Sequence, residues 1–233
     1  MHEPVPPWLR GTWARRSILR RSPTGTLDVC AADAGVVVRY IQTPWAFVDV
    51  RRPAPRRGPE GILAFAGVTT VADQVVRWHS ILNFDTMLPD PAGAWNDATA
   101  GCPRATEDAG WFTPQQEPCW LERALDGSLE EVWQKVDDGG GRFLCLQRGP
   151  TGIVVVVGEH FGAVIDDRAT GGSTCCYVAG RVTAAGWMID LSATDDAEEG
   201  QPLQLPGTPE DWTPTPDSTL SWPPVDWPSP MSG

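Results

Sequence analysis

The sequence predicts an all-β protein built around one antiparallel barrel of about ten strands. Short runs in which apolar and polar residues alternate recur along the chain, and turn residues separate them, as in strands joined by hairpins. No stretch with helical periodicity is longer than about ten residues. The 233 residues, of which 41% are hydrophobic, suffice for one large β domain with a substantial core.

The expected strands follow one another with mostly short connections. Residues 1–10 form a Pro-rich lead-in, and a hairpin turns at Thr43 and Pro44. A long, Pro-rich and acidic stretch, residues 85–127, is expected to be mostly loop. The predicted strands are residues 12–19, 36–41, 46–51, 62–71, 74–84, 128–136, 142–147, 153–157, 161–166, 175–181 and 187–191, and the long loop contains two short candidate strands, residues 110–112 and 119–122.

The end of the chain differs in composition from the rest. Prolines alternate there with Trp212, Trp222 and Trp227, and aliphatic residues are few. Such a segment has too few apolar side chains to form a hydrophobic core. We therefore expect residues 11–205 to form the barrel and residues 206–233 to form a disordered Pro/Trp-rich tail, whose Trp-Pro motifs are candidates for docking on a protein partner.

The charge pattern argues against a general nucleic-acid-binding protein. The net charge is −12, whereas nucleic-acid binding requires a basic face that displaces counterions from phosphates. No apolar run reaches the roughly 18 residues of a membrane span, and the first residues lack the layout of a secretory signal. We expect a cytoplasmic, acidic protein without a membrane partner, whose six cysteines are reduced.

Polar residues occupy one face of the predicted hairpin. Gln42 on its first strand and Asp49 and Arg51 on its second strand have the same parity, so they are expected to point together into the barrel. A buried charge needs a partner, which for Asp49 would be Arg15 or Arg51. This network is either a structural ion cluster or a patch that recognises a polar ligand.

Further candidates come from neighbouring strands. Arg15 and Ser17 share a parity, and His79 follows Trp78. Imidazole titrates near neutrality, so His79 and Asp49 are the candidate catalytic residues, and a hydrogen-bonded core histidine is the alternative for His79. The histidine spacing matches no metal motif, and no phosphate-binding loop or GxSxG is present, so we expect no metal and no cofactor.

Several short motifs occur in order over residues 8–205: GTWARRSI, VVVRYIQTPWAFVDVRRP, AFAG, RWHSILNF, PDPAG, LEEVW, HFGAVIDDR and GWMIDLSATDDAEEG. Together they resemble a family of lipocalin-like proteins of bacteria and algae, which occurs in fungi as a casein-kinase-interacting protein. The resemblance implies a lipocalin-like (calycin-type) barrel and no established reaction, because the family is largely of unknown function. It places recurrent polar positions at Arg15, Ser17, Gln42, Asp49, Arg51, His79, Glu131 and Arg168.

The first functional hypothesis is a soluble protein that binds a small, partly apolar ligand in its barrel, because barrels of this size often hold one such molecule. The ligand would carry an anionic or carbonyl group. Arg15 and Arg51 would receive this group, and Gln42 and His79 would orient it. Aromatic side chains would form the walls, namely Trp13, Trp78 and Trp133.

Two other functions stay open from the sequence. One is a protein-interaction module that acts through the acidic loops and the C-terminal tail. The other is a cofactor-independent isomerase or cyclase, in which His79 or Asp49 acts as a base on a bound apolar substrate. The sequence favours binding over catalysis, since it contains no recognisable catalytic motif.

Overall fold

A computed structural model describes residues 3–22, 24–28, 35–53, 63–85, 106–115, 118–167, 171–172, 175–194 and 199–215. These residues form two antiparallel sheets and two short 3₁₀ segments, Gly139–Gly141 and Pro209–Asp211, and they contain no α-helix. In the described part of the chain, no helix is long and apolar enough to cross a membrane. The prediction of an all-β, antiparallel protein is confirmed.

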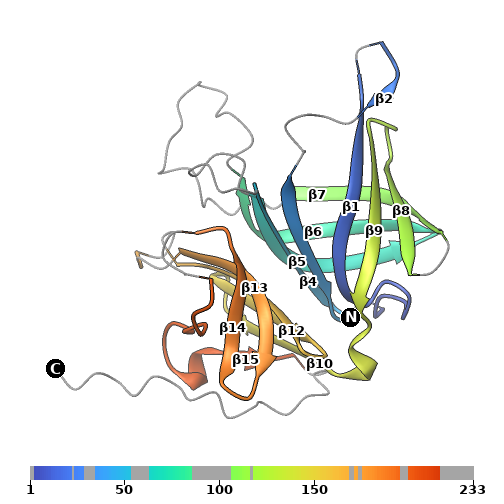
Figure 1. The fold of residues 1–233 in the computed structure, drawn as a ribbon. Coiled ribbons are helices and arrows are strands. Elements are labelled where there is room, and N and C mark those ends of the chain that lie inside the picture. Colours follow the sequence, from blue (N-terminus) through green and yellow to red (C-terminus); the bar gives the residue numbers. More distant parts are fainter. Residues whose placement is uncertain are drawn as a thin grey trace.

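The first sheet closes into a barrel, because its last strand pairs back onto its first (Figure 1). Of its nine strands, the short β2 (Leu27–Asp28) only extends the end of β1, so eight strands form the closed ring. Closure leaves no unpaired edge in the ring. The ring strands are β1 (Gly11–Arg21), β3 (Val36–Gln42), β4 (Ala46–Pro53), β5 (Leu63–Ala72), β6 (Val75–Asp85), β7 (Thr106–Pro114), β8 (Cys119–Ala124) and β9 (Leu129–Asp137).

The later strands form a second, open sheet in the order β14-β13-β12-β11-β10-β15, where the sequence predicted one barrel of about ten strands. This sheet covers the outer face of β3 to β6 (Figure 1). Its central strands are buried on both faces, so their apolar runs resemble those of any core strand. The strands are β10 (Phe143–Arg148), β11 (Gly152–Val157), β12 (His160–Asp166), β13 (Cys175–Thr183), β14 (Gly186–Ser192) and β15 (Thr213–Pro214).

Contact between the two sheets fixes the orientation of β4. Val48 and Val50 are fully buried in the apolar layer between the sheets. The second sheet approaches closely at Gly162, where a Cβ atom would lie only 2.7 Å from Cγ1 of Val48. Because side chains alternate along a strand, Asp49 and Arg51 must then point into the barrel.

The Pro-rich lead-in closes one end of the barrel. Val5 and Leu9 are buried, and the backbone N–H of Val5 donates to the carbonyl of Pro44 over 2.8 Å. The indole N–H of Trp13 donates to the carbonyl of Leu9 over 2.9 Å. These contacts make residues 3–10 an apolar plug at this end of the barrel.

Residues 203–215 cover the outer face of the second sheet. Leu203, Leu205 and Trp212 pack in its apolar cluster, and Nε1 of Trp212 donates to the carbonyl of Pro206 over 3.1 Å. The first part of the expected tail, residues 206–215, thus belongs to the described structure, and Trp212 is buried and cannot serve as an exposed docking residue. Residues 216–233, with Trp222 and Trp227, lie outside the described residues.

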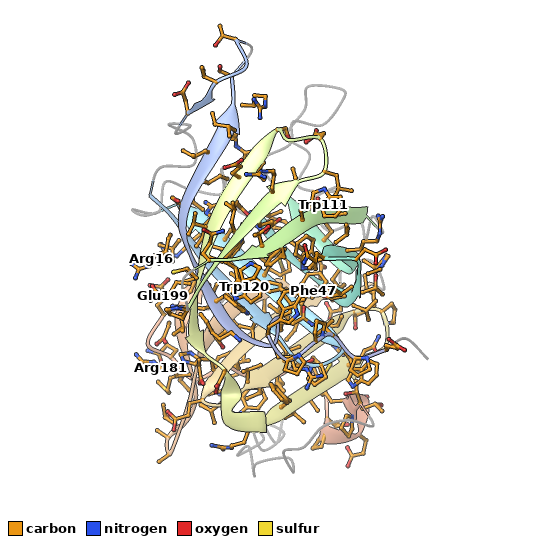
Figure 2. All side chains as sticks on the ribbon, turned by 90° about the vertical axis from the view of Figure 1, so that its right-hand side faces the viewer. Arg16, Phe47, Trp111, Trp120, Arg181 and Glu199 are labelled. Carbon is orange, nitrogen blue, oxygen red and sulfur yellow. The ribbon has the colours of Figure 1, made fainter. Side chains whose placement is uncertain are left out.

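Trp212→Ala should lower the free energy of unfolding by about 3–5 kcal/mol, because it removes a large side chain from a packed layer. Trp111→Ala is the matched control, since Trp111 is 44% exposed on the outer side of the barrel (Figure 2) and should change stability by less than about 1 kcal/mol. Urea unfolding of both variants measures the difference, and equal effects would contradict the packing of residues 203–215.

Candidate ligand-binding site in the barrel

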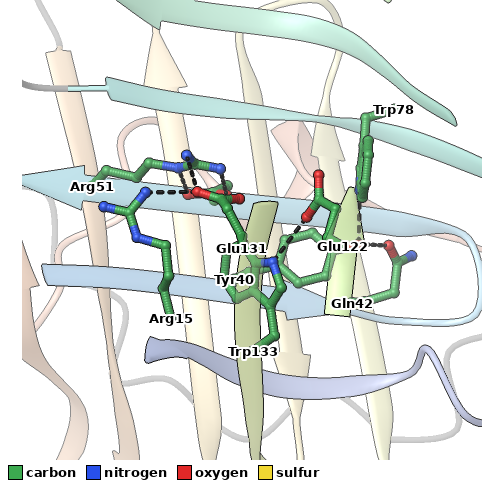
Figure 3. Close-up of polar contacts among 9 residues, drawn as sticks. Arg15, Tyr40, Gln42, Arg51, Trp78, Glu122, Glu131 and Trp133 are labelled. Atoms are coloured by element: carbon green, nitrogen blue, oxygen red, sulfur yellow. Dashed lines mark hydrogen bonds and ion pairs between the residues drawn. The ribbon is translucent and has the colours of Figure 1, made fainter. Parts of the chain in front are cut away.

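An ion network crosses the interior of the barrel (Figure 3). Nε and Nη2 of Arg51 donate to the two carboxylate oxygens of Asp49 over 3.0 and 2.9 Å, a bidentate pair. Nη1 of Arg51 lies 3.6 Å from Oε1 of Glu131, and Nη1 of Arg15 lies 2.7 Å from the same oxygen. Both arginines are therefore already held by carboxylates, and Asp49 has one of its two expected partners.

Burial sets the electrostatics of this network. It raises the pKa of Asp49, against the opposing effect of Arg51. Burial acts to lower the pKa of Arg51, but Asp49 and Glu131 outweigh it and raise the value further above its ordinary range. Arg51 is consequently a fixed positive charge between two carboxylates.

A second polar chain lies nearer the plugged end. Nε1 of Trp78 donates to the hydroxyl of Tyr40 over 3.0 Å, and this hydroxyl donates to Oε1 of Gln42. Oγ1 of Thr69 donates to the same oxygen over 2.7 Å, and Nε2 of Gln42 donates to the carbonyl of Thr43 over 2.7 Å. Gln42 thus has partners for its amide within the barrel wall, which makes it a structural residue.

A pocket lies inside the barrel beside the ion network. It encloses about 290 Å³ of space, part of it open to solvent. Asp108 on β7 is exposed, so the pocket reaches the surface beside it. Its lining consists of five aromatic residues and four charged ones, namely Tyr40, Phe65, Trp78, Phe112, Trp133, Asp49, Arg51, Asp108 and Glu122.

Glu122 differs from the other buried carboxylates. It lies on β8 directly opposite Glu131 on β9, and it is only 8% exposed. One of its oxygens accepts a hydrogen bond from Nε1 of Trp133 over 2.8 Å, and among the described residues it forms no ion pair (Figure 3). Burial and then Glu131 raise the pKa of Glu122 well above its usual value, so Glu122 keeps its proton to a higher pH than an exposed glutamate does.

Most of the residues expected in the site do lie in the barrel interior. The structure brings together Arg15, Asp49 and Arg51 in the ion network, and Trp78 and Trp133 line the pocket. Trp13 is buried in the apolar cluster beside the plug and is not among the residues that line the pocket. Glu131, which the resemblance indicated, joins both arginines.

Two expected site residues lie elsewhere. Ser17 is exposed because a bulge between Arg15 and Ser17 shifts the pairing of β1 with β9. His79 lies on the outer side of the barrel wall, since its neighbour Trp78 faces inward, and its Nε2 is 3.1 Å from Oγ1 of Thr70. His79 is thus not placed to act with Asp49. Arg168 lies outside the described residues.

The sequence reasoning missed Glu122, Asp108, Phe65 and Phe112. The signal for Glu122 was present in the hairpin of β8 and β9, where Trp120 and Glu122 face Trp133 and Glu131 in register. Charged residues with the parity of tryptophans predict an inward polar pair. The Pro-rich composition of residues 85–127 obscured this pattern.

No family model, curated protein or solved structure matches this chain. The resemblance to the lipocalin-like family therefore stays a prediction. Among the described residues, no group of three or more His, Cys, Asp or Glu side chains is arranged to hold a metal ion.

Arg51→Leu should lower the free energy of unfolding by about 3–5 kcal/mol, because it leaves buried carboxylates without their shared cation. Arg181→Leu is the control: Arg181 pairs with Asp190 at the surface (Figure 2), where an ion pair contributes less than about 1 kcal/mol. Urea unfolding compares the two variants, and a small effect of Arg51→Leu would contradict the network.

Glu122→Gln should stabilise the protein at pH 8 by about 1–3 kcal/mol. The folded state keeps the Glu122 proton over a pH range in which the unfolded chain has lost it, so raising the pH through that range favours unfolding of the parent. Glutamine can still accept the hydrogen bond from Trp133, and because its amide does not titrate, it removes this pH dependence of stability.

Thermal unfolding from pH 5 to pH 8 measures this gain, which should shrink toward pH 5. The control is Glu130→Gln, which alters the outward residue next to Glu131, where Glu130 pairs with Arg123 over 2.7 Å. A Glu122→Gln variant that is less stable than the parent at pH 8 would show that Glu122 is ionised and compensated in the empty site.

Proposed function

We propose that this protein binds a small, partly apolar molecule in the pocket of its barrel. The observation that carries the proposal is the pocket itself, an aromatic-lined space of about 290 Å³ that reaches the surface beside Asp108. An eight-stranded barrel is just wide enough for its own side chains to fill it or for one small ligand to enter. The aromatic lining of this space favours a small molecule that carries an apolar ring.

The arginines do not supply the ligand's polar contact in this proposal. Arg15 is paired with Glu131, and Arg51 is paired with Asp49 and lies near Glu131, so an anionic ligand would have to displace a carboxylate from a buried pair. The expectation of an anionic ligand group is therefore not retained. Glu122 and Asp108 are the acidic pocket residues outside these pairs.

A second candidate function is acid–base catalysis on the bound molecule. Its support is Glu122, a buried carboxyl group with a raised pKa in a pocket, which is the usual setting of a general acid. Glu122 takes the place of His79, whose side chain lies on the outer side of the barrel wall, and of Asp49, which Arg51 holds. Recovery of a chemically altered probe after incubation would favour this function over binding alone.

Phe112→Leu should weaken binding of an uncharged aromatic probe, neopentylbenzene, about threefold to tenfold, because it removes a ring from the pocket wall. Its matched control is Trp111→Leu, since Trp111 is the next residue on β7 and points outward. Tryptophan fluorescence titration of the full chain measures both affinities. Equal affinities in the two variants would place the probe outside the pocket.

Native mass spectrometry of the gently purified chain provides an independent test. A small molecule bound at a ratio of one to one and released on denaturation would support the proposal and would identify a ligand. An empty chain that also fails to bind neopentylbenzene would contradict it.

A further inference from the structure

We propose that the pocket recognises an organic cation, a substituted ammonium group, with Glu122 as its counter-ion and aromatic rings as its walls. This inference rests on the proposed function, and it names the chemical class of the ligand. It differs from the sequence-based expectation in the sign of the ligand's charge.

The balance of buried charges indicates this sign. Arg15 and Arg51 are the cations of the network, and they are surrounded by three buried carboxyl groups: Asp49, Glu131 and Glu122. If all are ionised, one negative charge is in excess inside the barrel. Asp108 adds a further carboxylate at the mouth. A ligand with a single positive charge restores the balance, whereas an anion increases the imbalance.

The position of Glu122 shows where the positive charge would lie. Its side chain is more than nine-tenths buried and lines the pocket, and its Oε2 atom accepts from Trp133. In the part of the chain that the structure describes, no lysine or arginine lies within ion-pair distance of it. A buried, ionised carboxylate without a neighbouring cation is costly. A cation that reaches Glu122 therefore gains the binding energy of a new, desolvated ion pair.

The walls around Glu122 fit an organic cation. Trp78 and Phe112 have ring centroids 5.7 Å apart at 58°, and Tyr40 and Trp78 meet edge to face at 84°, so the rings enclose a space and do not stack into one layer. The guanidinium of Arg51 already lies 5.9 Å from the ring centroid of Trp133. Ammonium groups bind to such ring faces through cation–π attraction.

The same lining disfavours a bare metal ion. Calcium takes six to eight oxygen ligands and magnesium a near-octahedral set. The pocket provides mostly ring carbon, and two of its carboxylates, Asp49 and Glu122, are already engaged by Arg51 and by Trp133. A cation whose charge is spread over carbon-bearing substituents matches this surface better than a hydrated ion.

Cation binding should release a proton. The charged and titratable groups that face Glu122 come from β1, β3, β4, β7 and β9. Burial and Glu131 favour the protonated form of Glu122, while Arg51 opposes it. Affinity for a cation should thus rise with pH until Glu122 is ionised in the empty site, by up to about tenfold per pH unit. The charged and titratable groups that face Glu122 are Arg15, Tyr40, Asp49, Arg51, Asp108 and Glu131.

The test compares benzyltrimethylammonium with neopentylbenzene, its uncharged carbon isostere, by tryptophan fluorescence titration of the full chain. At pH 8 the cation should bind at least about tenfold more tightly, and its preference should decrease toward pH 5. The quaternary nitrogen carries no proton, so this pH dependence belongs to the protein.

Glu122→Gln should abolish both the preference for the cation over neopentylbenzene and the pH dependence of that preference. Glu130→Gln, on the outer face of the same hairpin, should retain both. Equal binding of the two probes to the parent, or a preference that survives Glu122→Gln, would overturn the inference and leave the pocket as a site for neutral molecules. Binding of neither probe would instead overturn the proposed function.

Discussion

The guanidinium of Arg51 is the group on which the barrel interior depends. It bridges Asp49 on its own strand and Glu131 across the barrel, and Arg15 completes the contact with Glu131. Carboxylates at this depth are stable only when cations and hydrogen bonds compensate them. The network therefore joins β1, β4 and β9, which include the two strands whose pairing closes the barrel.

The second sheet packs against the strand that carries Asp49 and Arg51. It packs on the outer face of β4, where Val48 and Val50 are buried in the apolar layer and Gly162 permits a close approach. With its outward residues held in that layer, β4 cannot rotate, and Asp49 and Arg51 keep their inward orientation. The plug formed by residues 3–10 excludes solvent from its end of the barrel. This exclusion lowers the local dielectric constant and strengthens each buried ion pair.

Among the described residues that line the pocket, Glu122 is a buried carboxyl group with no cation within ion-pair distance. Its partner across the hairpin is Glu131, so two acidic residues lie in register where opposite charges would be more stable. Proteins often accept such a cost at functional sites, where a ligand supplies the missing interaction. The location of Glu122 among aromatic rings makes the same residue the centre of the proposed ligand site and of the alternative acid–base function.

The alternation of apolar and polar residues along each strand by itself determined much of the fold of this protein. It predicted the strands, the antiparallel hairpins and the inward orientation of Gln42, Asp49 and Arg51, because the period of two in a strand is a local property. Only the tertiary structure decided the features that depend on pairing between distant segments. The return of β9 onto β1 closes eight strands and leaves the others as a second sheet, and a bulge in that pairing turns Ser17 outward. The register of β8 with β9 places Glu122 opposite Glu131, and a one-residue change in register would have turned both away from the pocket.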